Sequence, residues 1–540
     1  MLRFLRALSL IIPVRLALVL ALGSGAVLAA TEPVIDLGMR RELFVDDLLL
    51  ERLDGGAARR QHHPEAREVA IVHDAPWEGN GCGYHSVFQD GAIYRMYYMT
   101  QTLTVAPGAV RKAEELVHFC CYAESDDGIH WRKPNLGLYE FQGSKANNIV
   151  MTVTPGVNAD PGHPAVFRDD HPATPPDARY KAVLRGRDPK GLVLFKSPDA
   201  IHWSPLRTEP VITGDRFDSQ NLAFWDVAAG TYRAYWRHWS GDTDARSLEG
   251  KAKGFRGIRT ATSPDLLHWS EPRDLQYGGA PDEHLYTSQV KPYHRAPHLL
   301  LGFPARYVER TWSDALRALP DRTNREVRSG MEERYGTALT EGVLMTSRDG
   351  VNFQRWPEAF LRPGPERPGT WNYGHQYIAW HLVETRSALP GAPNELSLYA
   401  DEDNWVGTAS AARRYTLRLD GFVSVRAPLA GGEARLRPVR FAGDRLFLNF
   451  STSAAGGVRV ELQDLSGQPY PGFSLADCPP LFGDAIEREV IWSGGASVGV
   501  LAGRPVRIRL VLRDADVFAF RFGTAPAKPL SSTPQHQSSR

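Results

Sequence analysis

The sequence predicts an all-β protein in which a five-bladed β-propeller over residues 31–420 is followed by a β-sandwich over residues 421–523. Three observations lead to this prediction. A short turn motif recurs along the chain, two strand-like runs precede each copy, and an alternation of apolar and charged residues begins after residue 421. Internal repeats are typical of ring-shaped or stacked architectures, and four antiparallel strands in each repeat are typical of a propeller blade.

The turn motif runs from a serine to an aromatic residue. It occurs at Ser125–Trp131, Ser197–Trp203, Ser263–Trp269 and, in a weakened form, Ser347–Phe353, and a degenerate fifth copy occupies Ala400–Trp405. Its central Asp and Gly are turn residues, because Asp accepts hydrogen bonds from its own backbone and Gly adopts positive φ angles. The aromatic residue at its end would pack one unit on the next. We therefore expect five units.

Three copies of the motif carry a histidine at the same position, His130, His202 and His268. A metal site built from them is one interpretation. However, equivalent positions of successive blades lie at the same radius of a ring and far from one another. We therefore expect these histidines to have a structural role.

The strands of the blades are visible as short apolar and aromatic runs. In the first unit, Tyr84–Phe88 is followed by a turn at Asp90 and Gly91 and then by the run from Ile93 to Met99. Such runs bounded by turn residues predict hairpins. A short helix is expected only near Trp312–Leu319, inside an insertion.

The C-terminal part has a different pattern. Val506–Arg513 alternates between apolar residues and mostly arginine, and Val458–Leu462 and Val517–Phe522 behave in the same way. A period of two predicts strands with one buried face, so we expect a separate sandwich domain. Residues 524–540 are rich in Pro, Ser, Gln and Thr and are expected to form a disordered tail.

The first thirty residues are expected to be a secretory signal peptide. Three arginines precede or interrupt the apolar run that ends at Leu22, and small residues lead to a cleavage position near Ala29 or Ala30. A membrane anchor is the alternative, but the uninterrupted apolar run is shorter than the roughly 20 residues that span a bilayer. Cleavage would move the formal net charge from +1 to −2. We therefore expect a soluble secreted or periplasmic protein that does not bind nucleic acid.

The four cysteines leave two interpretations open. Cys82, Cys120 and Cys121 lie in one segment, so one disulfide from Cys82 could form after export, whereas Cys478 stands alone. All four could equally be buried small apolar side chains. Their spacing is not that of metal ligands.

Several segments carry a resemblance to a known family. They are Phe44–Asp47, Pro76–Gly79, Phe217–Asn221, Pro297–His298, Phe303–Tyr307 and Arg414–Phe422. With the predicted domain order, they make the chain resemble the furanosidase superfamily of invertase-, levanase- and arabinanase-type glycoside hydrolases over about residues 36–523. More closely, the chain is similar to a bacterial group labelled as related to the invertase-type enzymes of glycoside hydrolase family 32. The resemblance implies an exported enzyme that hydrolyses an oligo- or polysaccharide at the mouth of the propeller funnel.

Characterised members of that superfamily carry three carboxylates on the inner strands of blades one to three, and this chain does not match the trio residue for residue. Glycoside hydrolysis needs a carboxylic acid with a raised pKa and a second carboxylate that acts as base or nucleophile. We expect Glu283, at the start of an inner strand of blade four, to be the acid, and Asp218, in blade three, to be the base or nucleophile. Each could instead be structural, Glu283 as an exposed strand carboxylate and Asp218 as a turn residue. Asp47, next to Asp46, is a third catalytic candidate and could instead cap a turn.

The remaining candidates would bind the sugar through hydrogen bonds or by stacking on its face. They are Glu78, Tyr84, His85, His163, Gln220, Asp282, Tyr286, Arg306, His375 and Trp405. Packing between blades is the alternative role for the aromatic residues among them.

No cofactor is expected, although His163 and His375 could flank a central structural Ca²⁺. The sequence leaves two other functions open. One is a non-catalytic carbohydrate-binding or scaffolding propeller, and the other is a protein-interaction propeller with an apolar top face.

Overall fold

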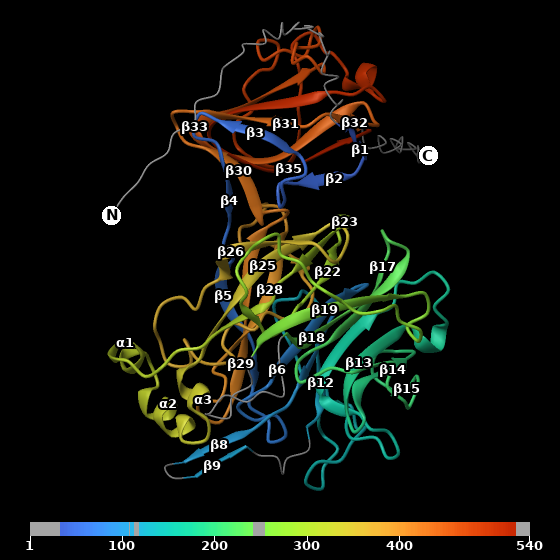
Figure 1. Ribbon diagram of the computed structural model, residues 1–540, viewed down its shortest axis with the longest axis vertical. Coiled ribbons are helices and arrows are strands. Elements are labelled where there is room, and N and C mark those ends of the chain that lie inside the picture. Colours follow the sequence, from blue (N-terminus) through green and yellow to red (C-terminus); the bar gives the residue numbers. More distant parts are fainter. Residues whose placement is uncertain (1–32, 107–108, 113–117, 241–253, 525–540) are drawn as a thin grey trace, which may run out of the picture.

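The computed structural model describes residues 33–106, 109–112, 118–240 and 254–524, and it confirms an all-β chain with a five-bladed propeller (Figure 1). Blade one consists of β6 (Gly83–Asp90), β7 (Ile93–Met99), β10 (Cys120–Ser125) and β11 (Ile149–Met151). Blade two consists of β12 (Asp160–Arg168), β13 (Tyr180–Arg187), β14 (Lys190–Ser197), β15 (Ser204–Pro205) and β16 (Ile212–Thr213). Blade three consists of β17 (Leu222–Asp226), β18 (Thr231–Ser240), β19 (Phe255–Ser263) and β20 (Arg273–Asp274).

Blade four is the largest. Its four strands are β22 (Lys291–Tyr293), β23 (Ala296–Gly302), β25 (Leu339–Ser347) and β26 (Phe353–Leu361). Its inner strand begins with β21 (His284–Leu285) and continues as β22, and its second strand continues from β23 into β24 (Ala305–Val308), since β24 pairs with both β21 and β25. The insertion after β24 forms α1 (Asp314–Ala318), α2 (Arg322–Ser329) and α3 (Glu333–Thr337), so the expected helix is confirmed as α1 and two more follow it.

Blade five closes the ring with a strand from the beginning of the chain. It consists of β27 (Val383–Thr385), β28 (Glu395–Glu402), β29 (Ser410–Arg418) and β5 (Glu65–His73), with β5 as its outermost strand. The last blade is therefore completed by residues that precede the first. A short hairpin, β8 (Leu103–Ala106) and β9 (Ala109–Lys112), follows β7 at the same end of the propeller as the three helices (Figure 1).

The repeated motif forms the same turn after the third strand of blades one to four. In the first copy, Ser125 Oγ accepts a hydrogen bond from the Gly128 amide at 2.9 Å, and Asp127 Oδ1 accepts bonds from the amides of Ile129 and His130 at 2.8 Å. The imidazole of His130 contacts the other oxygen of Asp127 at 2.7 Å and is 86% exposed. The ring therefore stabilises its own turn, which is the structural role expected for this histidine.

The degenerate fifth copy is not equivalent to the others. Residues 400–405 form the end of β28, which is the second strand of blade five, and the start of the turn after it, whereas the other copies lie at the end of a third strand. The number of blades was predicted correctly, but this segment was assigned to the wrong turn.

In three blades, a tyrosine on the second strand donates a hydrogen bond to the turn motif of the next blade. The hydroxyl of Tyr97 donates to the carbonyl of Ala200 at 2.8 Å, that of Tyr235 donates to Gly350 at 2.9 Å, and that of Tyr399 donates to Gly128. The aromatic residue at the end of each contacted motif packs edge-on against the same tyrosine, as Trp203 does on Tyr97 with ring centroids 6.1 Å apart. The motif therefore joins neighbouring blades.

Replacing Tyr97 or Tyr235 by phenylalanine is expected to lower the free energy of unfolding by roughly 1–3 kcal/mol, because a buried carbonyl loses its donor while the ring packing remains. Chemical denaturation checks this. The control is His202→Ala, in which an exposed side chain is lost and the change should stay within about 0.5 kcal/mol. Wild-type stability in both phenylalanine variants would show that the tyrosines do not fasten the blades.

Two buried glutamines hold the blades together at the propeller axis. The amide of Gln220 in blade three donates to the carbonyls of Tyr84 in blade one and Pro164 in blade two, at 2.7 and 2.8 Å. The amide of Gln289 in blade four donates to Gln220 Oε1 and to the carbonyl of Ile378, the latter in blade five, at 2.7 and 2.9 Å. These bonds connect the inner segments of all five blades and form a floor beneath the funnel.

The C-terminal unit is all-β, but its expected form as a sandwich is not confirmed. Its strands are β30 (Val423–Ala427), β31 (Gly432–Leu436), β32 (Val439–Phe441), β33 (Arg445–Gln463), β34 (Asp484–Glu489) and β35 (Arg507–Gly523). All of them except β32 belong to one eight-stranded sheet, in which the long strands β33 and β35 pair with each other.

The beginning of the chain also belongs to this C-terminal unit (Figure 1). Strands β2 (Arg41–Leu43), β3 (Leu50–Asp54) and β4 (Ala58–Gln61) pair with β35, β31 and β30, and β1 (Ile35–Gly38) pairs with β32. Residues 35–61 therefore lie with the second unit, although the expected boundary placed them in the propeller.

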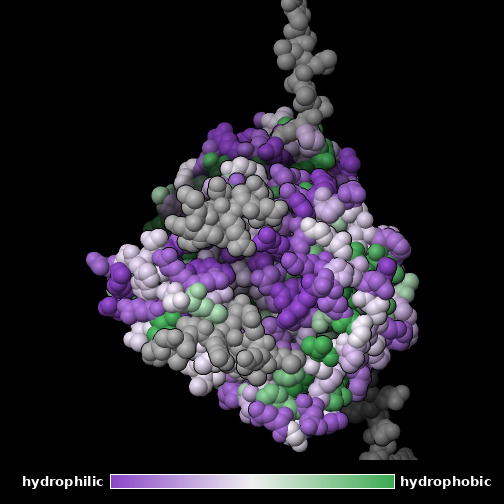
Figure 2. All heavy atoms as spheres, turned by 60° about the horizontal axis from the view of Figure 1, so that its bottom comes forward, coloured by the Kyte–Doolittle hydropathy of each residue, from purple (hydrophilic) through white to green (hydrophobic). Residues whose placement is uncertain are grey.

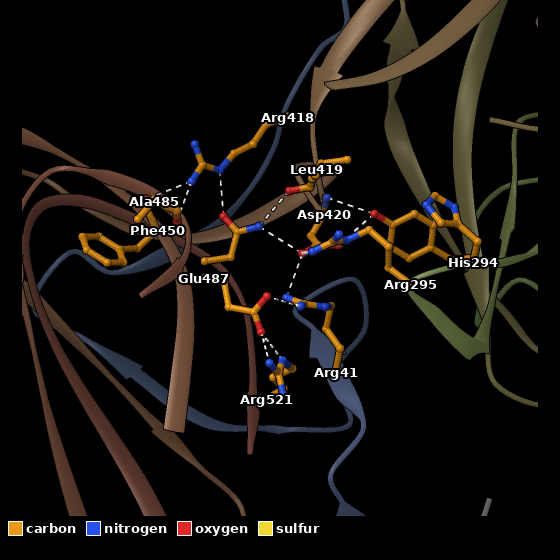
Figure 3. A network of polar contacts seen from close by, with 12 residues as sticks. Arg41, His294, Arg295, Arg418, Leu419, Asp420, Phe450, Ala485, Glu487 and Arg521 are labelled. Carbon is orange, nitrogen blue, oxygen red and sulfur yellow. Dashed lines mark hydrogen bonds and ion pairs between the residues drawn. The ribbon is translucent and has the colours of Figure 1, made fainter. Parts of the chain in front are cut away.

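A buried carboxylate links the two units (Figure 3). Asp420, between β29 and β30, accepts hydrogen bonds from Arg41 of β2 at 3.1 Å and from Arg295 of blade four at 2.9 Å. The hydroxyl of Tyr293 and the amide of Asn449 complete its contacts, at 2.8 and 3.0 Å. Burial opposes ionisation, but the two guanidiniums hold the pKa of Asp420 below its ordinary value.

Candidate active site

The candidate site is a pocket of about 140 Å³, lined in part by Arg334 and Tyr335 of α3. The three helices and the β8–β9 hairpin lie at the end of the propeller opposite the C-terminal unit (Figure 1). Figure 2 faces this end, where the described residues around the central hollow are mostly hydrophilic. This is not the apolar face that a protein-interaction propeller would present. The pocket is lined by residues 81, 83, 84, 99, 101, 118, 163, 185, 218, 286, 334, 335, 373, 374, 377, 401, 404 and 405.

Aromatic side chains form one wall of the pocket. Tyr373 lies at its centre, with its hydroxyl donating to that of Tyr286 at 3.1 Å and its ring 5.4 Å from Trp405. Tyr335, from α3, stacks on Tyr373, and Tyr377 lies 5.5 Å from Tyr286. Flat apolar surfaces with hydroxyl groups at their rims suit the faces and the hydroxyls of a sugar ring.

Two pocket residues have strained backbones. Tyr84 and Trp405 have φ angles of 53° and 60°, in the left-handed region that aromatic residues rarely adopt. The Trp405 amide donates to the Asn80 carbonyl at 2.6 Å, which helps hold this conformation. Such strain is concentrated at functional sites, because the surrounding structure must enforce it.

Asp218 is the ionised carboxylate of the pocket. It lies just before β17, its side chain is 63% exposed, and it contacts Arg185 at 2.5 Å, His163 at 3.5 Å and Arg237 at 3.6 Å. Enclosure by the protein favours its neutral form, but the His163 ring and the two guanidiniums hold the pKa of Asp218 well below its ordinary value. This carboxyl group is therefore negatively charged at any physiological pH.

Arg185 and His163 are held in place by a second carboxylate behind them. Asp160, which is buried, accepts a hydrogen bond from Arg185 and lies 3.4 Å from His163 Nδ1 and 3.3 Å from the ring of His118. Burial opposes its ionisation, but these histidines and arginines keep the pKa of Asp160 well below its ordinary value. The group orients the cations that face Asp218.

Asp401 is the second carboxyl group of the pocket, and its environment shifts its pKa in the opposite direction from that of Asp218. It lies on β28, is 4% exposed, and contacts His85 Nδ1 at 2.9 Å. Burial raises the pKa of Asp401, and His85 offsets this only in part. A β-carbon at Gly83 would lie 2.9 Å from Asp401 Oδ2, so the carboxyl group needs a glycine at that position.

Tyr84 lies beside a neighbour of each of the two carboxyl groups. It follows Gly83, which packs on Asp401, and its ring lies 5.2 Å from the ring of His163, which contacts Asp218. One pocket thus contains a carboxyl group that favours the protonated state and another that favours the ionised state. Such a pair is the usual arrangement of a general acid and a base or nucleophile.

Five of the expected site residues line this pocket. They are Asp218, Tyr84, His163, Tyr286 and Trp405.

Glu283, expected to be the acid, lies outside the pocket. It immediately precedes β21, at the start of the inner strand of blade four as expected, but it pairs with Arg306 at 3.1 Å and Arg355 at 3.3 Å. The expected sugar ligand Arg306 is engaged by Glu283 and Glu341, and Asp282 is exposed to solvent. None of these residues lines the pocket.

The other expected site residues are buried or remote. Glu78 bonds to Tyr98 and Lys133, Gln220 braces the propeller axis, and His375 accepts a hydrogen bond from the Trp371 amide. His85 lies behind Asp401, at the back of the pocket. Asp46 and Asp47 lie in the loop between β2 and β3, within the C-terminal unit. Asp47 pairs with Arg59 of β4, and Asp46 pairs with Arg348.

The pocket also contains residues that sequence reasoning missed. Asp401, Asn404 and Trp405 lie in the segment interpreted as a fifth turn copy, and only Trp405 was selected from it. Arg334 and Tyr335 come from the insertion after β24, for which the sequence offers no motif. Arg185 stands in the middle strand β13 of blade two and could have been suspected as a charged residue inside an apolar run.

The structure also bears on the predictions about metal ligands, disulfides and membrane-spanning segments. Within the described residues, there is no group of three or more His, Cys, Asp or Glu arranged to hold a metal ion. All four cysteines are buried and have free thiols, which agrees with the apolar interpretation and not with a disulfide from Cys82. The described part of the chain contains no helix long and apolar enough to cross a membrane. Residues 1–30, expected to be a signal peptide, and residues 525–540 of the expected tail lie outside the described residues.

Comparisons with known proteins find similarity only among solved structures. No family model and no curated protein matches the chain. The catalytic domain of a Coprinopsis cinerea GH62 α-L-arabinofuranosidase is 10% identical and has a TM-score of 0.38, and it covers 66% of this chain and 99% of its own. The Bombyx mori GH32 β-fructofuranosidase BmSUC1 is 9% identical with a TM-score of 0.35, and it covers 86% of this chain and 95% of its own.

A third similar structure is an N-acetylgalactosamine deacetylase from F. plautii in complex with blood group B trisaccharide. It is 14% identical with a TM-score of 0.37, and it covers 67% of this chain and 94% of its own. Glycoside hydrolases are thus among the solved structures that are similar to this chain. At these levels of similarity, the function must be inferred from the chain's own side chains.

Proposed function

We propose that the protein hydrolyses glycosidic bonds in an oligo- or polysaccharide bound in the axial pocket, with Asp401 as general acid and Asp218 as base or nucleophile. The observation that carries the proposal is the pair of carboxyl groups with opposite pKa shifts in one aromatic pocket. Asp401 takes the acid role that the sequence suggested for Glu283, because Glu283 is engaged by two arginines away from the pocket.

The chemistry of each residue follows from its surroundings. Asp401 would protonate the oxygen of the leaving group as the glycosidic bond breaks, since burial raises the pKa of its carboxyl group. Asp218 would activate water or attack the sugar, and in either role it stabilises the positive charge that develops on the ring. Tyr373, Tyr377 and Trp405 would stack on the sugar, and Arg334 would bind its polar groups.

A non-catalytic carbohydrate-binding propeller is the second candidate, and one observation favours it. Asp218 is already engaged by Arg185, His163 and Arg237, and this ion-pair network could be purely structural. A carboxylate that is fully compensated is a weaker nucleophile. The aromatic wall would then serve binding alone.

The function is tested by measuring sugar release from pooled plant and algal polysaccharides and from nitrophenyl furanosides and pyranosides. The purified wild type is run beside Glu283→Gln, which removes a carboxylate outside the pocket. We expect release by both proteins at similar rates. Release that is lost in Glu283→Gln while its melting temperature is unchanged would return the acid role to that residue.

The proposal predicts a distinct pH dependence of kcat/KM. Asp218 stays ionised far into the acid range, so the activity should be constant there and should fall about tenfold per pH unit as pH rises through the raised pKa of Asp401. Rates over a pH series with an alkyl glycoside check this. An activity that rises with pH through the acidic and neutral range would contradict the role of Asp401.

We further propose that the protein acts outside the cytoplasm after removal of residues 1–30. The charged start, the short apolar run and the small residues before Ala30 support this.

A further inference from the structure

A row of buried side chains runs from the pocket to the outside of the propeller. Asp401 Oδ1 lies 2.9 Å from His85 Nδ1, and His85 Nε2 lies 3.0 Å from Nε2 of a second histidine, His73. The other nitrogen of His73 lies 3.8 Å from Glu78 Oε1, and the second oxygen of Glu78 accepts a hydrogen bond from Lys133 at 2.6 Å. Lys133 is partly exposed and pairs with the exposed Asp74.

The row is built from separate parts of the chain. Asp401 comes from β28 of blade five, His85 from β6 of blade one, and His73 from β5, the N-terminal strand that completes blade five. His73 and His85 are almost completely buried, and the ring of Tyr98 packs on both, with centroids 4.4 and 5.5 Å away. Tyr98 also donates a hydrogen bond to Glu78 at 2.5 Å. The charged groups that face the two imidazoles are thus Asp401 at one end, and Glu78 and Lys133 at the other.

The contact between the two Nε2 atoms couples the two rings. One nitrogen must carry a hydrogen and the other must accept it, so the tautomer of one ring determines that of the other. Burial lowers the pKa of His73 to about 4, so this ring is neutral at neutral pH and can change its tautomer without becoming charged.

Each protonation state of Asp401 corresponds to one arrangement of the pair. When Asp401 is ionised, His85 donates from Nδ1 to the carboxylate, His73 donates from Nε2 to His85, and Nδ1 of His73 is bare. Neither this nitrogen nor Asp401 Oδ1 has a hydrogen-bond partner in the structure, so the 2.9 Å contact between His85 Nδ1 and Asp401 Oδ1 must align before a proton passes. When Asp401 is protonated, it donates to His85, and both hydrogens move to the opposite nitrogens, so that the Nδ1–H of His73 faces the Glu78 carboxylate.

We propose that His85 and His73 form a proton relay that returns protons from the surface, through Lys133 and Glu78, to the pocket carboxyl group of Asp401. The inference rests on the proposed role of Asp401 as acid. His73 is a positioning and relay residue, because it does not reach the pocket.

The transfer balances at every step. A proton that reaches Glu78 from solvent at Lys133 passes to Nδ1 of His73, the Nε2 proton of His73 passes to Nε2 of His85, and the Nδ1 proton of His85 passes to Asp401. Each ring gains one proton and loses one. Asp401 changes from carboxylate to carboxylic acid, and Glu78 returns to its ionised state, which its neighbours His73 and Lys133 favour despite its burial.

The test reads Asp401 directly and does not need a substrate. The infrared band of its protonated carboxyl group is identified as the band that disappears in Asp401→Asn. The rate at which this band appears after a rapid drop in pH is then measured in the wild type, in His73→Gln and in His238→Gln. The last variant removes another buried histidine, in blade three, away from the row.

We expect protonation of Asp401 to slow about tenfold or more in His73→Gln and to be unchanged in His238→Gln, since a glutamine amide can hydrogen-bond but cannot pass a proton on. In turnover, His73→Ala should lower kcat without raising KM, and added imidazole should restore kcat in this variant but not in Asp401→Asn.

Equal protonation rates in all three proteins would overturn the relay, whether or not the protein hydrolyses sugars. A slowed rate in His73→Gln together with no sugar release from any substrate would leave the relay standing and overturn the hydrolase. If His73→Gln does not fold, Lys133→Gln at the partly exposed end of the row gives the same comparison.

Discussion

Asp401→Asn is expected to lower kcat/KM for glycosides with poor leaving groups by about 10²–10⁴-fold, the usual contribution of a general acid. Asparagine keeps the size of the side chain and can still contact His85 and Gly83, but it has no proton to donate. The effect should therefore appear in the rate and not in the folding of the protein. Steady-state rates with alkyl glycosides, beside melting curves, measure both.

The same variant should behave differently with a good leaving group. A dinitrophenolate departs without being protonated, so its glycoside should be hydrolysed by Asp401→Asn at close to the wild-type rate. Asp218→Asn is the matched comparison, since loss of the base or nucleophile should lower the rate for both leaving groups. A loss in Asp401→Asn that is equally large for both classes of substrate would mean that Asp401 is not the acid.

Asp420→Ala is expected to lower the free energy of unfolding by about 3–5 kcal/mol, the cost of leaving a buried charge without its partner. The side chain is completely buried and contacts Arg41 and Arg295, together with Tyr293 and Asn449 (Figure 3). The variant removes the carboxylate that the two guanidiniums share between the propeller and the C-terminal unit, and it leaves them only the longer contacts of Arg41 with Glu487 at 3.5 Å and of Arg295 with Glu384 at 3.7 Å. Chemical denaturation measures the loss, and limited proteolysis should show easier cleavage between the units.

The control for this prediction is Asp484→Ala, which removes an exposed carboxylate that pairs with Arg418 near the same interface. An exposed ion pair contributes at most about 1 kcal/mol. Because the pKa of Asp420 is lowered in the folded state, its contribution is complete above the unfolded value of about 3.9 and is lost as pH falls through the folded value. Asp420→Ala should therefore lose less stability on acidification than the wild type does. Equal stability of the two alanine variants would contradict the role of Asp420.

The propeller could be predicted from the sequence because its repeated turn is made by local interactions. The serine, aspartate and glycine of the motif bond to backbone groups within the same seven residues, so the pattern survives in the sequence wherever the turn is needed. The closing of the ring by β5, and the pairing of β2 to β4 with strands after residue 421, depend on contacts between residues more than 330 positions apart. No local pattern records such contacts.

The site was harder to predict than the fold. Asp218 was selected because it lies just before a recognisable inner strand, and Tyr286 because it lies in the inner strand of blade four; both line the pocket. Asp401 was missed since its segment looked like another turn, and what distinguishes it is burial beside Gly83 and His85, which only the tertiary structure creates. Glu283 looked suitable because it begins the inner strand of blade four, and that placement is correct, but its carboxylate pairs with Arg306 and Arg355 and does not line the pocket.

The most direct test of the central claim compares release and binding of the same sugar in the wild type, Asp218→Asn and Asp401→Asn. A substrate with a poor leaving group is chosen from those that the wild type cleaves or binds, and the melting temperature is measured for each protein. If the pocket is a glycosidase site, the wild type releases sugar, both variants lose release and keep binding, and all three melt alike. If all three proteins bind the sugar and none releases it, the two carboxyl groups do not form a catalytic pair and the propeller is a binding module.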